Sequence, residues 1–185
     1  FIGGVAANRK KDYDLFLLFD YRKFGPTLFL EAFNQVRHNS ADDADLGELR
    51  FRYNLTEVAL GTRFSLSSHH HSRLSFIYDR YNANIKYEID NFPVSFGYTY
   101  FQGKTVAFEH HFDARLRAVD GEINPRAGRN INFRYAREFN SFIHSDAEQA
   151  FTLSDYGTFV ENYEPHNLHR FQLEWTERFA LPARS

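Results

Sequence analysis

"GEINPRAGRNINFRYAREFN", residues 121 to 140, is the stretch of sequence that decides the fold. A turn rich in Gly and Pro leads into a segment whose side chains alternate in character one by one. The apolar set is Ile131, Phe133, Tyr135 and Phe139, and the polar set between them is Asn132, Arg134 and Glu138. Because successive side chains of a β-strand point to opposite faces, this alternation predicts a strand with one apolar and one polar face.

The same period of two recurs along the chain. Examples are "LRFRYNL" (49–55), "VALGTRFSL" (58–66), "RLSFIYD" (73–79), "VSFGYTY" (94–100) and "RFQLEW" (170–175). The pattern predicts about ten strands, each near the ~9–11 residues that cross a bilayer at a tilt. Gly, Pro and Asn predict turns between them at 24–27, 81–84, 90–93 and 101–104. We expect one domain over residues 1–185, with a long polar loop at about 141–166 and room for a short helix at 145–151.

The composition limits the class of protein. The 185 residues carry a net charge of -2, so no global field favours nucleic acid. Phe (21) and Tyr (11) are abundant although mean hydropathy is -0.54, and so polar a soluble domain has little interior for them. No run approaches the ~18 apolar residues of a membrane helix. A membrane β-barrel stays open, because its apolar residues are spread over every second position.

Two residue types are absent from the sequence, Cys and Met. Without Cys there are no disulfides, thiolate metal sites or cysteine nucleophiles. Without Met there is no initiator residue, so we expect a processed product or a fragment.

Alternation alone does not say which face meets water. A soluble β-sandwich turns its polar face outward, whereas a transmembrane barrel turns its apolar face to lipid and its charges inward. Long and numerous strands, aromatics towards strand ends, and Arg mixed with Asp or Glu on the polar faces favour an antiparallel transmembrane β-barrel over a soluble all-β domain. The predicted lipid-facing residues are Ile131, Phe133, Tyr135 and Trp175. The predicted lumen-facing residues are Arg63, Asp79, Glu109, Arg134 and Glu138, read as paired barrel filling, or alternatively as a channel lining.

"INPRAGRNINFRYAREFNSFI" (123–143) resembles the turn and strand of the Omp85 (surface antigen D15, BamA-like) outer-membrane barrels. Pro125, Gly128 and Arg129 match the turn pattern of that family. The chain is also similar to the barrel part of bacterial proteins that place such a barrel after a TolB-like propeller. The resemblance covers roughly residues 95 to 182. It implies part of a larger barrel in the bacterial outer membrane, although the chain has too few strands to close one and no propeller or POTRA-like domain.

Other motifs weigh less. Asp42, Asp43, Asp45 and Glu48 are a weak candidate for Ca²⁺ ligands, but a solvated acidic loop, or one bridged by divalent ions at a lipopolysaccharide surface, is the preferred interpretation. Three consecutive His at 69–71 predict a solvated loop, and His110 and His111 point to opposite faces. No Gly-x-Ser-x-Gly is present, and an outer-membrane phospholipase would need a Ser/His pair on neighbouring strands. We therefore predict no enzyme, no catalytic residue and no cofactor.

The expected function follows from the family likeness. It is structural anchoring, or protein assembly and translocation, in the bacterial outer membrane. The expected partners are outer-membrane lipid, lipopolysaccharide and proteins of a membrane complex, without nucleic acid. A pore or transport barrel is the first alternative, and a conductance measurement distinguishes it from a plugged scaffold. A soluble, lipocalin-like binding domain is the second, and it predicts solubility without detergent.

Overall fold

The computed structural model describes residues 2–7, 12–23, 25–43, 47–89, 92–115, 127–146 and 148–179; for residues 7, 42, 43, 47 and 89 it describes the backbone only. These residues form strands, turns and bends. Among them there is no helix that is long and apolar enough to cross a membrane.

Ten strands lie in the described part of the chain. Their bounds are β1 Ile2–Ala7, β2 Tyr13–Tyr21, β3 Thr27–Asp43, β4 Gly47–Ser65, β5 His70–Ile89, β6 Phe92–Asp113, β7 Gly128–Ile143, β8 Phe151–Leu153, β9 Phe159–Glu161 and β10 Tyr163–Arg178. Long strands of this kind need side chains that fit a pleated surface, and the Phe, Tyr, Val and Ile of this chain do so.

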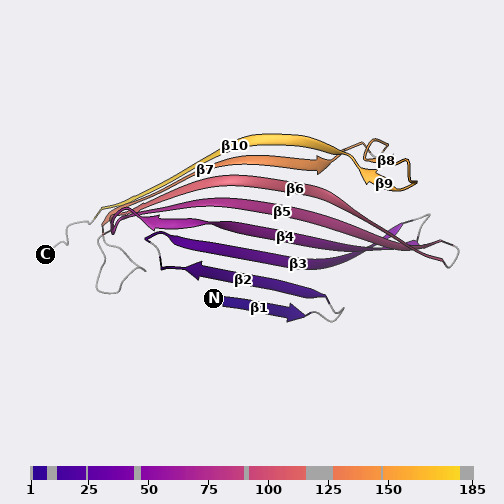
Figure 1. Cartoon of the computed structure of the whole chain (residues 1–185), viewed down its shortest axis with the longest axis horizontal. Coiled ribbons are helices and arrows are strands. Elements are labelled where there is room, and N and C mark those ends of the chain that lie inside the picture. The colour runs from indigo at the N-terminus through magenta and orange to yellow at the C-terminus, as the bar shows by residue number, and fades with distance from the viewer. Residues whose placement is uncertain are drawn as a thin grey trace.

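Eight strands make one antiparallel sheet in the order β1-β2-β3-β4-β5-β6-β7-β10. Each pairs with its neighbour in the chain, except that β8 and β9 form a separate hairpin between β7 and β10. Figure 1 shows the sheet as one curved layer, with the hairpin at one end, which is here named the β8–β9 end. The predicted all-β antiparallel fold is confirmed. The sheet is not closed into a barrel, since β1 and β10 each have one neighbour and lie at its opposite borders.

The turns predicted at 81–84 and 101–104 are wrong. Residues 81–84 lie inside β5, which has 20 residues, and residues 101–104 lie inside β6, which has 22. In β5 the apolar residues change from even positions, as at Phe76, to odd positions, as at Ile85, while in β6 they stay at even positions and the face that they occupy changes. The cause in β6 is a register shift opposite Tyr81 and Asn82, where Tyr100 is the extra residue of a bulge.

The connection predicted at about 141–166 contains structure of its own. β7 runs to Ile143 and β10 begins at Tyr163, so the connection between them is shorter. In place of the expected short helix there is a single turn, in which the backbone N–H groups of Gln149 and Ala150 donate to the carbonyl of Asp146. The β8–β9 hairpin follows directly.

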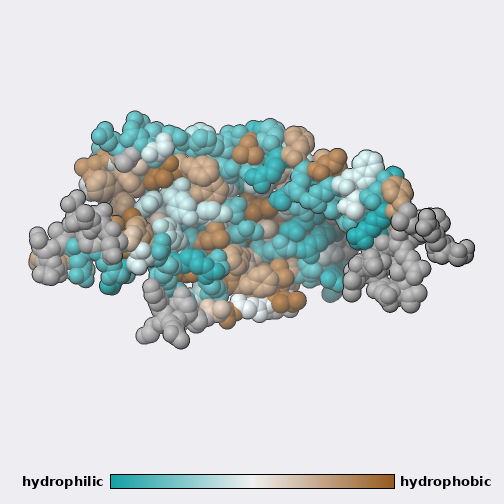
Figure 2. Space-filling view, turned by 180° about the vertical axis from the view of Figure 1, so that it is seen from behind, coloured by the Kyte–Doolittle hydropathy of each residue, from teal (hydrophilic) through white to brown (hydrophobic). Residues whose placement is uncertain are grey.

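The molecule has little conventional core. Among the described residues its buried apolar side chains are five Ala, Phe29 and Val36, and no large side chain is fully buried. Its accessible surface is 13787 Å², whereas a compact protein of this mass exposes about 9,300 Å². Figure 2 accordingly shows hydrophobic side chains lying open among hydrophilic ones. Most side chains on both faces of this single sheet are therefore at least partly exposed.

Candidate functional site

The strand register assigns side chains to two faces, because partners in an antiparallel pair point to the same side. One face, here named the belt face, carries an apolar band that crosses the sheet from β2 to β10. Its residues are Leu15, Leu17, Phe19, Leu28, Leu30, Val58, Leu60, Phe64, Leu74, Phe76, Tyr78, Val106, Phe108, Phe112, Ile131, Phe133, Tyr135, Phe171, Leu173 and Trp175. This set is the apolar belt.

The belt is open to its surroundings. Leu60 is 50%, Leu173 67% and Trp175 61% exposed. Soluble monomers rarely expose contiguous apolar patches beyond a few hundred Å². The belt runs over seven adjacent strands, so it is a large apolar surface for a protein in water.

The opposite face, here named the charged face, carries most carboxylates of the sheet. They are Asp14, Asp20, Glu31, Glu57, Asp79, Glu109, Asp113, Glu138, Glu164 and Glu174. Among the described side chains of these strands, the belt face has carboxylates only near strand ends, at Glu48, Glu88 and Glu177. The two faces thus differ in charge as well as in hydropathy.

A cluster of ion pairs fills the charged face over β2 to β5. Arg63 pairs with Asp20 at 2.8 Å and also with Glu31, which accepts a second pair from Arg73 at 2.8 Å. Both guanidinium groups lie over the ring of Phe29, at 4.4 and 4.3 Å from its centroid. Each of these four charged groups therefore has an opposite charge beside it.

Further ion pairs continue across β6, β7 and β10. Arg134 lies 3.4 Å from Glu109, and Arg170 lies 3.2 Å from Glu138. The structure thereby places all five residues predicted to face a lumen, Asp79 included, on the charged face. It places the four residues predicted to face lipid on the belt face.

Towards the β8–β9 end, the two faces exchange character. In β4 the belt face carries Val58 and Leu60 but then Asn54, Arg52 and Arg50, while apolar residues continue on the opposite side. There an aromatic cluster forms, whose members are Phe51, Tyr53, Tyr81, Phe96, Tyr98, Tyr100, Phe101 and Phe142. The apolar side of the sheet is therefore not the same along the whole length of its strands.

The β8–β9 hairpin covers part of this aromatic cluster. The ring of Phe151 lies 5.1 Å from that of Phe96 and 5.7 Å from that of Tyr98. Polar contacts attach the hairpin region at the bulge: the backbone N–H of Thr99 donates to Glu161 at 3.3 Å, and the hydroxyl of Tyr163 donates to the carbonyl of Thr99 at 2.9 Å. The bulge that exchanges the faces in β6 is thus also the point to which the hairpin is tied.

The belt crosses the strands obliquely. The residues that are paired side by side across the sheet, starting from Leu15 on β2, are Asn34, Thr56, Arg80, Gln102, Ser141 and Pro165. Only Leu15 of this register row belongs to the belt. On β10 the belt ends at Phe171, six residues further along (171 minus 165). Six residues are about 20 Å along the strand, and six strand-to-strand steps are about 29 Å, which gives a tilt of about 35°. Membrane barrels tilt their strands by ~35–45°.

The family-like turn is described in part. Pro125 lies outside the described residues. Gly128 begins β7 with φ of 118°, a conformation that favours glycine. Arg129 donates to Glu177 at 2.8 Å and lies over the ring of Trp175 at 5.4 Å. The turn therefore places a cation at the edge of the belt, next to its only tryptophan.

The candidate Ca²⁺ ligands lie where β3 meets β4. Asp45 lies outside the described residues, and only the backbone of Asp42 and Asp43 is described. Glu48 accepts a hydrogen bond from Arg50 at 2.8 Å. Among the described residues no group of three or more His, Asp or Glu side chains is arranged to hold a metal ion.

Histidines meet serines across the strands at the other end of the sheet. His70 and His71 belong to β5 and not to a loop. Ser72 Oγ lies 2.9 Å from His110 Nδ1, and His110 Nε2 lies 3.2 Å from His70. A Ser/His pair on neighbouring strands therefore exists. Ser72 is only 5% exposed, however, and a second imidazole stands where a nucleophilic site needs a carboxylate or amide to orient its base.

Sequence reasoning missed one feature of the belt face, a row of cations at its border. Arg80, Lys104 and Arg137 lie there on β5, β6 and β7. The available signal was a cation two positions from the last apolar residue of an alternating segment, as in "FIYDR" (76–80) and "GKTV" (103–106). The pairing of the strands is needed to show that the three cations lie next to one another.

Comparison of the chain with protein-family models, with curated proteins and with solved structures yields no match.

Proposed function

We propose that the chain is part of a bacterial outer-membrane β-barrel, with its belt face towards lipid and its charged face towards the barrel interior. One observation carries the proposal. The belt face is apolar across the sheet and then becomes polar on the same face towards the β8–β9 end. The outward face of a membrane barrel changes from apolar to polar in the same way, because its residues contact hydrocarbon within the bilayer and water beyond it.

A soluble ligand-binding domain accounts less well for the same pattern. In such a domain the apolar residues of a strand stay on the side that faces the core. Here they change sides within β4 and β5, from Leu60 to Phe51 and from Phe76 to Ile85. The oblique course of the belt, at about 35° to the register rows, also matches the strand tilt of a barrel in a flat bilayer.

The two borders of the sheet support a larger assembly of strands. An open sheet edge leaves backbone N–H and C=O groups without partners, and hydrocarbon offers none. β10 is exposed along most of its 16 residues, and it includes the belt residues Phe171 and Leu173. In a membrane this edge pairs with a further strand, so the eight strands form one part of a barrel wall.

The role we propose is anchoring, or the assembly or translocation of proteins, with partner proteins of the same membrane. The resemblance of 123–143 to Omp85 barrels points to this role. The charged face supports a filled interior, since Arg63, Arg73 and Arg134 each have a carboxylate beside them. A pore is the alternative, and single-channel conductance in a planar bilayer distinguishes a conducting barrel from a filled one.

Site-directed spin labelling tests the proposed orientation, because the chain has no native Cys. Labels are placed in vesicles at Leu60→Cys in the belt and at Arg52→Cys on the same face of β4 beyond it. Collisions with oxygen, which concentrates in hydrocarbon, are compared with collisions with a water-soluble nickel complex. We expect an oxygen preference at position 60 and a nickel preference at position 52. A nickel preference at both positions would refute the proposal.

A further inference from the structure

Arg80, Lys104 and Arg137 form a diagonal row on three adjacent strands at the border of the belt. Lys104 lies opposite Tyr78, the last belt residue of β5, and Arg137 lies opposite Val106, the last belt residue of β6. Each cation is therefore displaced by two residues from the next, and diagonal neighbours of this kind are about 7–8 Å apart. On these three strands the border of the belt also moves by two residues per strand, from Tyr78 to Val106 to Tyr135, so each cation lies next to the last belt residue of its own strand.

Among the described residues, the contacts of Arg80 and Arg137 are with groups other than carboxylates. Arg80 donates to Thr99 Oγ1 at 3.0 Å, and Arg137 contacts His169 and lies over the ring of Phe139 at 5.1 Å. No ion pair with a described carboxylate is found for any of the three. Among the described side chains, the belt-face carboxylates of these strands stand near strand ends, as at Glu88.

Other arginines of the chain differ from this row. On the charged face Arg63 and Arg73 have carboxylates beside them, and on the belt face Arg129 is paired with Glu177. Three adjacent cations without anions repel one another and need an anion from outside. Their place beside an apolar belt indicates an anion that belongs to an amphiphile.

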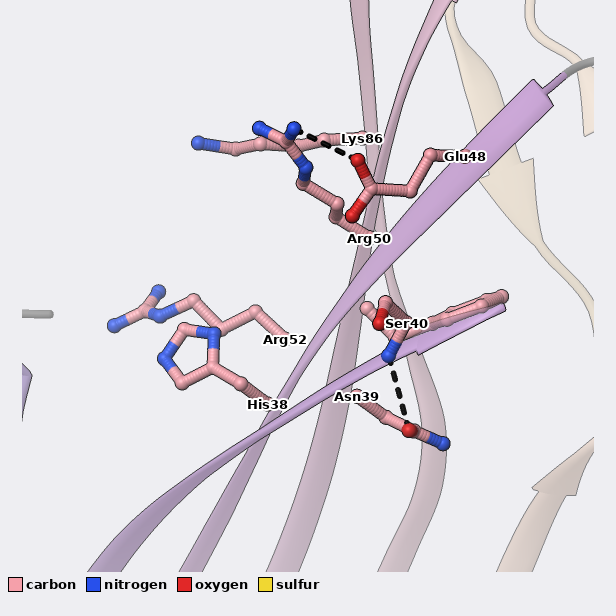
Figure 3. A pocket seen from close by; sticks show the side chains of 8 residues that line it. His38, Asn39, Ser40, Glu48, Arg50, Arg52 and Lys86 are labelled. Atoms are coloured by element: carbon pink, nitrogen blue, oxygen red, sulfur yellow. Dashed lines mark hydrogen bonds and ion pairs between the residues drawn. The ribbon is translucent and has the colours of Figure 1, made fainter. Parts of the chain in front are cut away.

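A separate groove lies further along the same face at the β8–β9 end, and none of the three cations lines it. It has a volume of about 600 Å³, and Arg50, Arg52, Lys86 and His38 extend to one side of it (Figure 3). Arg50 is held by Glu48 and Arg52 by Asp12. Lys86 has no described carboxylate as ion-pair partner and adds a positive charge beyond the row.

We propose that Arg80, Lys104 and Arg137 bind the phosphate of a phosphorylated lipid headgroup whose acyl chains lie along the belt. This inference rests on the proposed membrane orientation. Guanidinium and ammonium groups form short charge-assisted hydrogen bonds with phosphate oxygens. Basic side chains beside a membrane surface attract anionic headgroups in the same way. An apolar belt with a cationic border thus recognises both parts of one molecule.

The test uses the whole protein in nanodiscs of phosphatidylcholine with and without phosphatidic acid, and native mass spectrometry counts the phosphatidic acid that is retained. The variant is Arg80→Gln/Lys104→Gln/Arg137→Gln. The matched control is Arg22→Gln/Lys23→Gln/Arg178→Gln, which removes equal charge at the opposite ends of the strands. We expect at least about 10-fold weaker retention in the variant and an unchanged value in the control.

Three results would overturn the inference. Equal retention by variant and control would mean that the cations bind no particular headgroup. Equal retention of phosphatidic acid and phosphatidylcholine by the unmodified protein would mean the same. Equally tight binding of inorganic phosphate to the protein in detergent would make the site one for free phosphate and not for a lipid. Quenching of Trp175 by brominated lipid in the same nanodiscs reports membrane orientation separately, so a failure of the proposed function is distinguishable from a failure of this inference.

Discussion

An arginine placed in the belt should cost far more than the same arginine placed beyond it. Leu173 and Asn167 lie on the same face of β10, and both are exposed, so neither replacement removes much packing. They are six residues apart, which is about 20 Å along the strand and, at a tilt of about 35°, about 16 Å in depth. Position 173 is the central belt residue of β10, between Phe171 and Trp175, whereas position 167 lies four residues beyond Phe171 on the same face.

We therefore expect Leu173→Arg to destabilise the folded protein by about 2–4 kcal/mol and Asn167→Arg by about 0–1 kcal/mol. In a water-soluble sheet both would stay within about 0.5 kcal/mol, because exposed surface substitutions have small effects. The assay is reversible guanidinium unfolding in lipid vesicles, followed by the fluorescence of Trp175. Equal and small effects of the two substitutions would refute the membrane orientation of β10.

Three further predictions concern the sheet itself. Gly61→Ala should destabilise the protein by about 1–3 kcal/mol in urea unfolding, since a Cβ there would lie 2.1 Å from the carbonyl O of Leu74. Gly4→Ala is the control and should not destabilise the protein, because the space around Gly4 is open. Equal effects of the two substitutions would contradict the close approach of β4 and β5. Glu31→Gln should cost about 1–3 kcal/mol because it removes the carboxylate shared by two arginines, and Glu48→Gln, in an exposed pair, should cost less; the reverse order would contradict the network. Phe151→Ala should speed hydrogen exchange in the β8–β9 hairpin without changing global unfolding, and unchanged exchange would show that its ring contacts do not hold the hairpin.

Much of the sheet could be predicted from local sequence. The strand around Ile131 and Phe133, and the sorting of Arg134 and Glu138 to its other face, follow from the period of two alone. The same period placed Trp175 with the apolar residues. Such predictions succeed because side-chain direction in a strand depends only on position.

The lengths of the strands could not be predicted in that way. In β4 the apolar residues occupy odd positions up to Leu55 and even positions from Val58. Read window by window, this change of phase looks like two strands with a turn between them. It is in fact one strand whose outward face changes character along its length, as Arg52 and Leu60 show. A change of phase without Gly or Pro at that point was the available signal.

The cross-strand sites depended on register, which local patterns do not give. Glu31 meets Arg63 and Arg73 from two other strands, at separations of 32 and 42 residues. Arg80, Lys104 and Arg137 come together only because β5, β6 and β7 pair with particular offsets, including the bulge at Tyr100. Register is set by the whole set of pairings and the bulges within them, so it appears only once the sheet is assembled.

The most direct test of the central claim uses Trp175, the single tryptophan of the chain. Its indole is 61% exposed on the belt face, beside Arg129 at the edge of the belt. The protein is reconstituted in lipids brominated at different depths along their acyl chains, and the fluorescence is measured. We predict strong quenching that is greatest for bromines near the headgroup, since Trp175 ends the belt on β10. Absence of quenching, with the protein soluble without detergent, would contradict the assignment of the belt face to lipid.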